Sequence, residues 1–131
     1  DAAKLKGVSL EIIGEDGVVN GVRRLLYEVV YNLCDNAIKY NQPGGRVKVT
    51  VAQKSGEVLL SVQDTGIGIS PEHQEKVFER FYRVDKSHSR QSGGTGLGLS
   101  IVKHAVQYHH GRIILESEQN KGTTVSVILS K

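Results

Sequence analysis

Residues 22–40 read VRRLLYEVVYNLCDNAIKY, and this stretch constrains how the rest of the chain folds. Apolar side chains recur in it at intervals of three and four residues, the spacing of one face of an α-helix. They are Val22, Leu26, Val29, Leu33 and Ala37. No proline occurs in residues 18–40, and the breaker run NQPGG follows at residues 41–45. We therefore predict one long helix within residues 18–40 that buries one face in a core.

The same helix carries four polar side chains that fall within roughly 80° of its circumference. They are Glu28, Asn32, Asn36 and Lys39. Oxygen atoms of Glu28 and Asn32 suit a hard cation such as Mg²⁺, which takes few protein ligands and keeps waters or phosphate oxygens. Asn36 and Lys39 are able to donate hydrogen bonds to phosphate. On these residues alone, a solvated polar stripe remains the alternative interpretation.

Outside this helix, alternating apolar residues and an enrichment in β-branched residues predict five strands. The strands are expected at residues 8–13, 46–53, 57–63, 112–117 and 123–129. The second and third strands form one hairpin and the last two form another. A short helix capped by Ser70 is predicted over residues 71–78, and a longer helix over residues 97–109. This order favours an α+β fold, a two-layer sandwich whose mixed sheet carries helices on one face.

Length and composition exclude several classes of protein. The chain has 131 residues and a formal net charge of +3, so one domain spanning residues 1–131 is expected. The chain has only five Tyr and two Phe, and no run of five basic residues, which argues against nucleic-acid binding. No stretch approaches the roughly 20 apolar residues of a membrane span. Cys34 is the single cysteine, which excludes an internal disulfide, and no zinc-ligand spacing occurs. The first residue is Asp1 rather than Met, so a fragment of a longer protein is expected.

The run DTGIG at residues 64–68 ends the third predicted strand. The Asp64 carboxylate is able to accept a hydrogen bond from an exocyclic amine. Glycines at positions 66 and 68 allow the backbone to approach a flat base. An ordinary strand-to-helix turn, with Asp64 as a local acceptor, is the alternative interpretation.

A second glycine-rich run, GGTGLG at residues 93–98, leads directly into the predicted helix at 97–109. Backbone N–H groups at a helix N-terminus form a site for anions such as phosphate. The run lacks the spacing of a dinucleotide-binding fingerprint and the GxxxxGK pattern of a Walker loop. A flexible hinge before the helix is the alternative.

A long loop is predicted over residues 79–96, between the two glycine-rich runs. The run FERFYR at residues 78–83 opens it, and four basic residues in it stand against two acidic ones. The basic residues are Arg80, Arg83, Lys86 and Arg90. A positively charged segment between an aromatic anchor and a glycine hinge resembles a lid that closes on phosphate.

Four segments in this order resemble the ATP-binding catalytic domain of sensor histidine kinases, within the gyrase/Hsp90/histidine-kinase/MutL superfamily. NLCDNAIKY at 32–40 is similar to the asparagine box, and DTGIGI at 64–69 to the first glycine box. FERFYR at 78–83 is similar to the phenylalanine box, and GTGLGLS at 94–100 to the second glycine box. The run FYRVDKS at 81–87, which overlaps the phenylalanine box, most resembles the phosphate-responsive sensor kinases. The resemblance covers residues 8–129 and implies a Bergerat-type ATP-binding fold.

The resemblance implies ATP and Mg²⁺ as cofactors and assigns roles to individual residues. Asp64 is implied to bind the adenine amine, and Tyr40 to lie along the base. The implied metal ligands are Asn32 and Glu28, although many relatives have glutamine in the place of Glu28. The implied catalytic residues are Glu28, Asn32, Lys39 and Arg80. The implied nucleotide contacts are Asn36, Tyr40, Asp64, Gly66, Gly68, Gly94, Thr95, Gly96, Leu97 and Gly98.

Residues 79–96 are implied to form an ATP lid, from which Arg80, Arg83 or Lys86 approaches the γ-phosphate. The family transfers this phosphoryl group to a histidine of a separate dimerisation domain, in a His-Glu-Leu-Arg-like context. None of the five histidines here has that context. They are His73, His88, His104, His109 and His110. The phosphoacceptor and sensor domains are therefore expected outside these 131 residues.

The implied partners are the protein's own phosphoacceptor domain and, through it, a response regulator. The resemblance implies a cytoplasmic, monomeric domain without membrane contact of its own, in a membrane-anchored parent protein. The alternative from another class is a nucleotide-binding clamp or regulatory ATPase module of the same superfamily. Such modules usually have no phenylalanine box, which favours the kinase.

Overall fold

The computed structural model describes residues 7–14, 21, 23–74, 76–78 and 98–130. Its helices and strands follow one another in the predicted order, and their ends differ from the predicted ends by only a few residues. The elements are β1 (Ser9–Gly14), α2 (Arg23–Lys39), β2 (Arg46–Lys54), β3 (Glu57–Asp64), α3 (Pro71–Gln74), α5 (Gly98–Tyr108), β4 (Arg112–Glu118) and β5 (Gly122–Ser130). The predicted lid, residues 79–96, lies outside the described residues.

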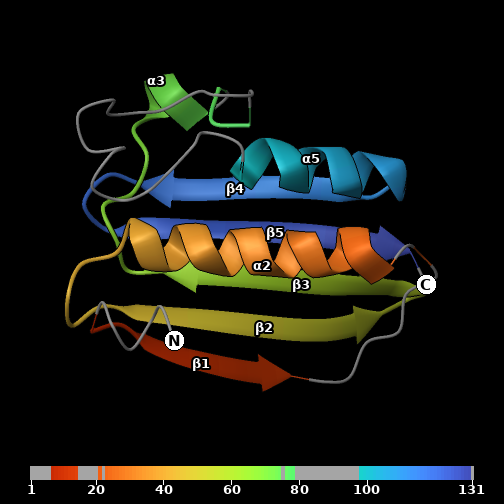
Figure 1. Ribbon diagram of the computed structural model, residues 1–131, viewed down its shortest axis with the longest axis horizontal. Helices are drawn as coiled ribbons and strands as arrows, with labels where there is room; N and C mark the ends of the chain where they lie inside the picture. The colour runs from red at the N-terminus through yellow and green to blue at the C-terminus, as the bar shows by residue number, and fades with distance from the viewer. Residues whose placement is uncertain (1–6, 15–20, 22, 75, 79–97, 131) are drawn as a thin grey trace.

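The five strands form one mixed sheet in the order β1-β2-β3-β5-β4 (Figure 1). β1 and β2 are parallel, and a parallel pair needs a crossover connection, which here contains α2. The other neighbours are antiparallel, and β2–β3 and β4–β5 are the two predicted hairpins. β3 also pairs with β5, in a register that places Asp64 opposite Thr123.

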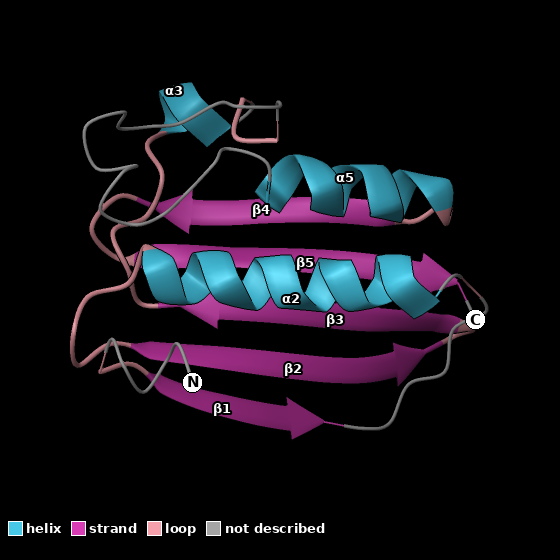
Figure 2. Cartoon of the chain, viewed as in Figure 1, coloured by secondary structure: helices cyan, strands magenta, loops and turns pink. Residues whose placement is uncertain are grey.

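The helices α2 and α5 lie side by side on one face of this sheet (Figure 2). Every second residue of the central strands points toward the helices, because side chains alternate between the two faces of a strand. The core between the two layers includes Val29, Leu33 and Ala37 of α2, Val102, Ala105 and Val106 of α5, and Val47, Val49, Leu60, Val62, Val125 and Val127 of the sheet. The predicted two-layer sandwich is thereby confirmed.

The short helix α3 ends at Gln74, earlier than the predicted residue 78. A turn follows, in which the His73 carbonyl accepts hydrogen bonds from the N–H groups of Lys76 and Val77. No residue of α3 is buried, whereas Val77 is. A helix this short gains little by itself, so burial of Val77 governs the path of the chain here.

The ends of several elements meet at one end of the molecule, at left in Figure 1. They are the C-terminal ends of α2, β3 and β4 and the N-terminal ends of α5 and β5. This end therefore carries Asp64, the residues that follow α2 and the β4–β5 turn.

Among the helices that the structure describes, none is long and apolar enough to cross a membrane.

Candidate functional site

Asp64 is the last residue of β3, in the row of side chains that faces the helices. Val58, Leu60 and Val62 precede it at alternate positions, and all three are buried. Asp64 continues that row as a half-buried carboxyl, between Val47 of β2 and Thr123 of β5. Partial burial of a carboxyl at the end of an apolar row has a desolvation cost in free energy. Such unfavourable groups are typical of ligand-binding sites.

The two oxygens of the Asp64 carboxyl group have different environments. Oδ1 accepts hydrogen bonds from the backbone N–H of Gly66 at 2.9 Å and of Thr123 at 3.2 Å. Within the described part of the chain, Oδ2 has no hydrogen-bond partner. Burial raises the pKa of Asp64 above its ordinary value, and the two backbone hydrogen bonds offset part of that rise. The group is thus fixed through one oxygen, and the other is available to an N–H donor.

The loop after Asp64 is held between the end of α2 and the β4–β5 turn. The Ile67 N–H donates to the Tyr40 carbonyl at 3.2 Å, and the Asn120 N–H donates to the Ile67 carbonyl at 2.7 Å. A Cβ on Gly66 would lie 2.4 Å from the Tyr40 carbonyl oxygen. Gly68 has a φ of +71°, and a Cβ there would lie 2.1 Å from the Glu118 carbonyl oxygen. The structure thus explains both glycines by close approach to protein backbone, where the sequence suggested approach to a base.

The four polar residues predicted on α2 are all half-buried. The Asn32 side-chain amide donates to the Glu28 carbonyl at 2.7 Å. Among the described residues the Asn32 side-chain oxygen and the Glu28 carboxylate have no hydrogen-bond or ion-pair partner, so both are available to a ligand. In the described ranges, no three acidic, His or Cys side chains form a metal-binding group. Two oxygen donors one turn apart suit Mg²⁺, whose other ligands are waters or phosphate oxygens.

Lys39 and Tyr40 close the helix beside the Asp64 loop. The Lys39 ammonium lies 2.9 Å from the Asp35 carboxylate, one turn back on α2, and this partner was not predicted. Tyr40 follows the last helical residue and its side chain is exposed, while its carbonyl holds Ile67. The predicted residues of the asparagine box thus lie next to the first glycine box.

Asn41 is a structural member of the site that the sequence does not reveal, because the breaker run NQPGG already accounts for an asparagine at this position. It is 4% exposed. Its side-chain amide donates to the Arg46 carbonyl at 3.0 Å, and its oxygen accepts from the Gln42 N–H at 2.9 Å. The Arg46 N–H in turn donates to the Thr65 hydroxyl at 2.8 Å. These hydrogen bonds join the end of α2 to the loop that follows Asp64.

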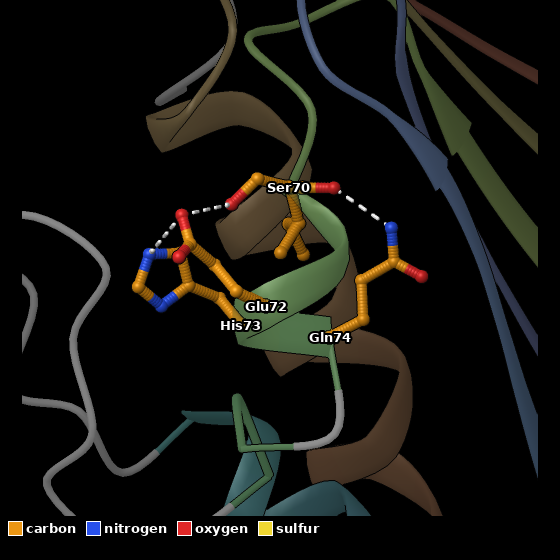
Figure 3. Close-up of polar contacts among 5 residues, drawn as sticks. Ser70, Glu72, His73 and Gln74 are labelled. Carbon is orange, nitrogen blue, oxygen red and sulfur yellow. Dashed lines mark hydrogen bonds and ion pairs between the residues drawn. The ribbon is translucent and has the colours of Figure 1, made fainter.

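A second missed group lies on the other side of the loop, around Ser117 and Gln74. The Ile69 N–H donates to the Ser117 hydroxyl at 2.7 Å. The Gln74 side-chain amide donates to the carbonyls of Ile69 at 2.8 Å and Ser117 at 3.1 Å, and Figure 3 shows the first of these bonds. The signal was slight, since a serine and a glutamine in polar surroundings rarely stand out in a sequence.

Ser70 immediately precedes α3, as predicted for a cap, but its hydroxyl has a different partner. The Ser70 hydroxyl donates to the Glu72 carboxylate at 3.3 Å, which also lies 3.7 Å from the His73 ring (Figure 3). The Ser70 backbone carbonyl accepts from the His73 N–H at 3.0 Å. The backbone bond takes the N–H that a capping hydroxyl would otherwise accept.

Part of the predicted site lies outside the described residues. These positions are Arg80, Gly94, Thr95, Gly96 and Leu97. Gly98 is described and is the first residue of α5, so the second glycine box does lead into a helix, as predicted. The start of α5 lies at the same end of the molecule as Asp64 (Figure 1).

Comparison with known proteins agrees with this geometry. The sequence family described as Histidine kinase-, DNA gyrase B-, and HSP90-like ATPase matches residues 21–131. Sensor histidine kinase RppB of Synechocystis sp. is 47% identical over 104 residues, which are 79% of this chain and 23% of RppB. Sensor-like histidine kinase SenX3 of Mycolicibacterium smegmatis is 43% identical over 116 residues, 88% of this chain and 28% of SenX3. The chain thus spans about a quarter of the length of these relatives.

A solved structure of the mycobacterial sensor histidine kinase MprB has the same fold. It is 34% identical, with a TM-score of 0.84, and the match covers 98% of this chain and 85% of that one. The closer likeness to phosphate-responsive kinases stays a prediction. The chain belongs to the histidine kinase-, DNA gyrase B- and HSP90-like ATPase family, as an ATP-binding catalytic domain of the sensor histidine kinase type.

Proposed function

We propose that this domain binds Mg-ATP and transfers the γ-phosphoryl group to a histidine on the phosphoacceptor domain of its own parent protein. The Asp64 carboxyl supports this proposal more than any other feature, because one oxygen is fixed and the other has no hydrogen-bond partner among the described residues. β3 ends at Asp64, at the end of the molecule where α2 also ends and α5 begins (Figure 1). A nucleotide base is recognised by such an acceptor, and its phosphates by a helix N-terminus.

The base end of the site is formed by Asp64 and its loop. Asp64 Oδ2 accepts a hydrogen bond from the adenine 6-amino group, and Tyr40 lies along the base. Gly66 and Gly68 keep the loop pressed against its two neighbours, so the carboxyl is held in place before the nucleotide arrives. Little ordering of the protein is then required when the base binds.

The phosphate end of the site is formed by α2, the second glycine box and the lid. Asn32 and Glu28 hold Mg²⁺, which when bound neutralises charge on the phosphate oxygens. Asn36 and Lys39 face the phosphate chain. The backbone of residues 94–98, including Thr95 and Leu97, surrounds it at the start of α5. Arg80 in the lid approaches the γ-phosphate. Phosphoryl transfer of this kind depends mainly on positioning and charge stabilisation.

The acceptor imidazole comes from a separate dimerisation domain, which passes the phosphoryl group on to a response regulator. We place the domain in the cytoplasm, as a monomer when isolated, within a membrane-anchored parent. The match covers only 23% and 28% of the two named relatives, which leaves room in proteins of that length for acceptor and sensor domains.

The domain is expected to bind Mg-ADP about 5- to 150-fold more tightly than Mg-IDP and Mg-GDP. Both competitors carry a carbonyl at position 6, which would face Asp64 Oδ2 as acceptor against acceptor, a mismatch of roughly 1–3 kcal/mol. Calorimetric titration of the three diphosphates measures the difference. IDP is the matched control because its base lacks the 2-amino group of guanine, so it isolates the change from the 6-amine and bare N1 of adenine to a 6-carbonyl and a protonated N1. Equal affinities for ADP and IDP would refute the role of Asp64.

A further inference from the structure

The hydroxyl of Ser117 lies at the centre of a group of hydrogen bonds next to Asp64. It accepts from the Ile69 N–H at 2.7 Å and donates to the Gly122 carbonyl at 3.0 Å. The Thr123 hydroxyl lies 2.7 Å from the same oxygen. Ser117 is half-buried near the end of β4. None of these three hydrogen bonds is to Asp64 itself.

The Gly122 carbonyl and the Thr123 N–H belong to one peptide unit. Because the peptide is trans, its C=O and N–H groups lie in one plane and point in opposite directions. Ser117 binds the carbonyl side, and Asp64 Oδ1 binds the N–H side at 3.2 Å. The hydrogen bonds therefore run in series, from the Ser117 hydroxyl through this peptide unit to the Asp64 carboxyl. Bonds in series polarise one another, so each strengthens the next.

Gly122 has no side chain, so it places little restriction on the orientation of the Gly122–Thr123 peptide. Its φ is +129°, a conformation that residues with side chains rarely adopt, and a Cβ there would lie 2.1 Å from the Asp64 carbonyl oxygen. Close packing therefore requires glycine, and glycine permits rotation of the peptide that follows it. A rotated peptide would aim the Gly122 carbonyl, instead of the Thr123 N–H, at the Asp64 carboxyl. Besides the pairing of β5 with its neighbouring strands, the Ser117 hydroxyl opposes such a rotation, because it binds the Gly122 carbonyl.

We propose that Ser117 is a positioning residue for base recognition, which fixes the Gly122–Thr123 peptide so that its N–H holds Asp64 Oδ1 and leaves Oδ2 aimed at the nucleotide. This inference rests on the proposed nucleotide site. It extends that site to a side chain on β4 that lies outside all four sequence boxes. Gln74 supports the arrangement from α3, because its amide binds the backbone carbonyls of both Ile69 and Ser117.

The test is Ser117→Ala, with Ser126→Ala as the matched control. Ser126 is also half-buried and shares a 3.0 Å hydrogen bond with Ser61, on the face of the sheet that points away from Asp64. In the nucleotide-free domain, hydrogen exchange at the Thr123 amide is expected to rise about 3- to 10-fold relative to the core amide of Val127. The ratio to Val127 removes any general loss of stability. An unchanged ratio, or an equal change in Ser126→Ala, overturns the proposal.

The affinity for Mg-ADP, measured by competition against a fluorescent analogue, is expected to fall about 3- to 10-fold in Ser117→Ala. In an Asp64→Asn background the same substitution is expected to cost less than about twofold, because Ser117 acts through Asp64. An equal loss in both backgrounds means that Ser117 acts elsewhere, and the proposal fails. If the wild-type domain does not bind ADP, the proposed function fails, while the exchange at Thr123 still decides whether Ser117 holds the peptide.

Discussion

Asn32→Ala is expected to slow phosphoryl transfer from Mg-ATP to a separately supplied acceptor domain by at least about 100-fold. Asn32 is half-buried on α2, and its side-chain amide donates to the Glu28 carbonyl, so its oxygen is left for the metal. Charge stabilisation by a bound metal contributes several kcal/mol to such reactions, and about 2.7 kcal/mol corresponds to 100-fold in rate. Alanine removes the oxygen and leaves the helix intact, because alanine is the best helix former.

The assay mixes this domain with labelled ATP and a purified dimeric phosphoacceptor domain from a sensor histidine kinase, and follows acid-labile label on the acceptor. Gln107→Ala, an exposed amide on α5, is the matched control and is expected to retain the wild-type rate. Asn32→Asp keeps an oxygen ligand and is expected to recover part of the rate. A rate in Asn32→Ala equal to that of the control would remove Asn32 from the metal site.

The same experiment tests where the nucleophile lies. The domain alone is expected to acquire no acid-labile label, because none of its histidines has the context of a phosphoacceptor. His88 lies in the predicted lid and is therefore the histidine to replace first. Label on the lone domain that disappears in His88→Ala would show that this chain carries its own acceptor, which contradicts the proposed transfer to a separate domain.

The sequence was sufficient to predict the elements of the fold, because each has a local signal. The long helix shows apolar residues at helical spacing, and NQPGG marks its end. The strand order has no such local signal. β3 pairs with β5, in a register that joins residues 59 to 73 positions apart, and β1 lies parallel to β2. These pairings depend on tertiary packing, because each strand must bury its apolar face under α2 and α5.

For the site, the sequence identified residues whose chemistry is unusual for their position but missed those that act through backbone geometry. Asp64 is recognisable because a carboxyl ends an apolar strand. Asn41 and Ser117 contact carbonyl and N–H groups, which look alike in every sequence. The reason for Gly66 and Gly68 is likewise absent from the sequence, because it lies in the Tyr40 and Glu118 carbonyls that pack against them.

Asp64→Asn is expected to weaken Mg-ADP binding about 5- to 150-fold at neutral pH. The carboxyl is fixed by two N–H donors on Oδ1, so an asparagine in its place keeps its oxygen toward Gly66 and Thr123. The side-chain NH₂ then takes the place of Oδ2 and meets the adenine amine as donor against donor. A buried mismatch of this kind costs roughly 1–3 kcal/mol, which gives the range stated.

The same substitution is expected to stabilise the nucleotide-free domain at neutral pH. Burial raises the pKa of Asp64 above its ordinary value of 3.8, so the folded state holds this proton more tightly than the unfolded state. Ionisation therefore destabilises the fold progressively, as the pH rises from below 3.8 through the raised pKa. Asparagine carries no such charge. Its stabilising effect should be full above the raised pKa and absent below 3.8.

Denaturant unfolding of wild type and Asp64→Asn across this acid range, with ADP titrations at the same pH values, separates the two effects. Wild-type affinity is expected to fall as the pH drops through the raised pKa, because a protonated carboxyl loses its charge, whereas the affinity of Asp64→Asn stays level. A variant that is less stable than wild type at neutral pH would mean that the two backbone hydrogen bonds outweigh burial. Opposite signs for binding and stability would instead show that the fold tolerates an unfavourable carboxyl at the end of β3 because the nucleotide needs it.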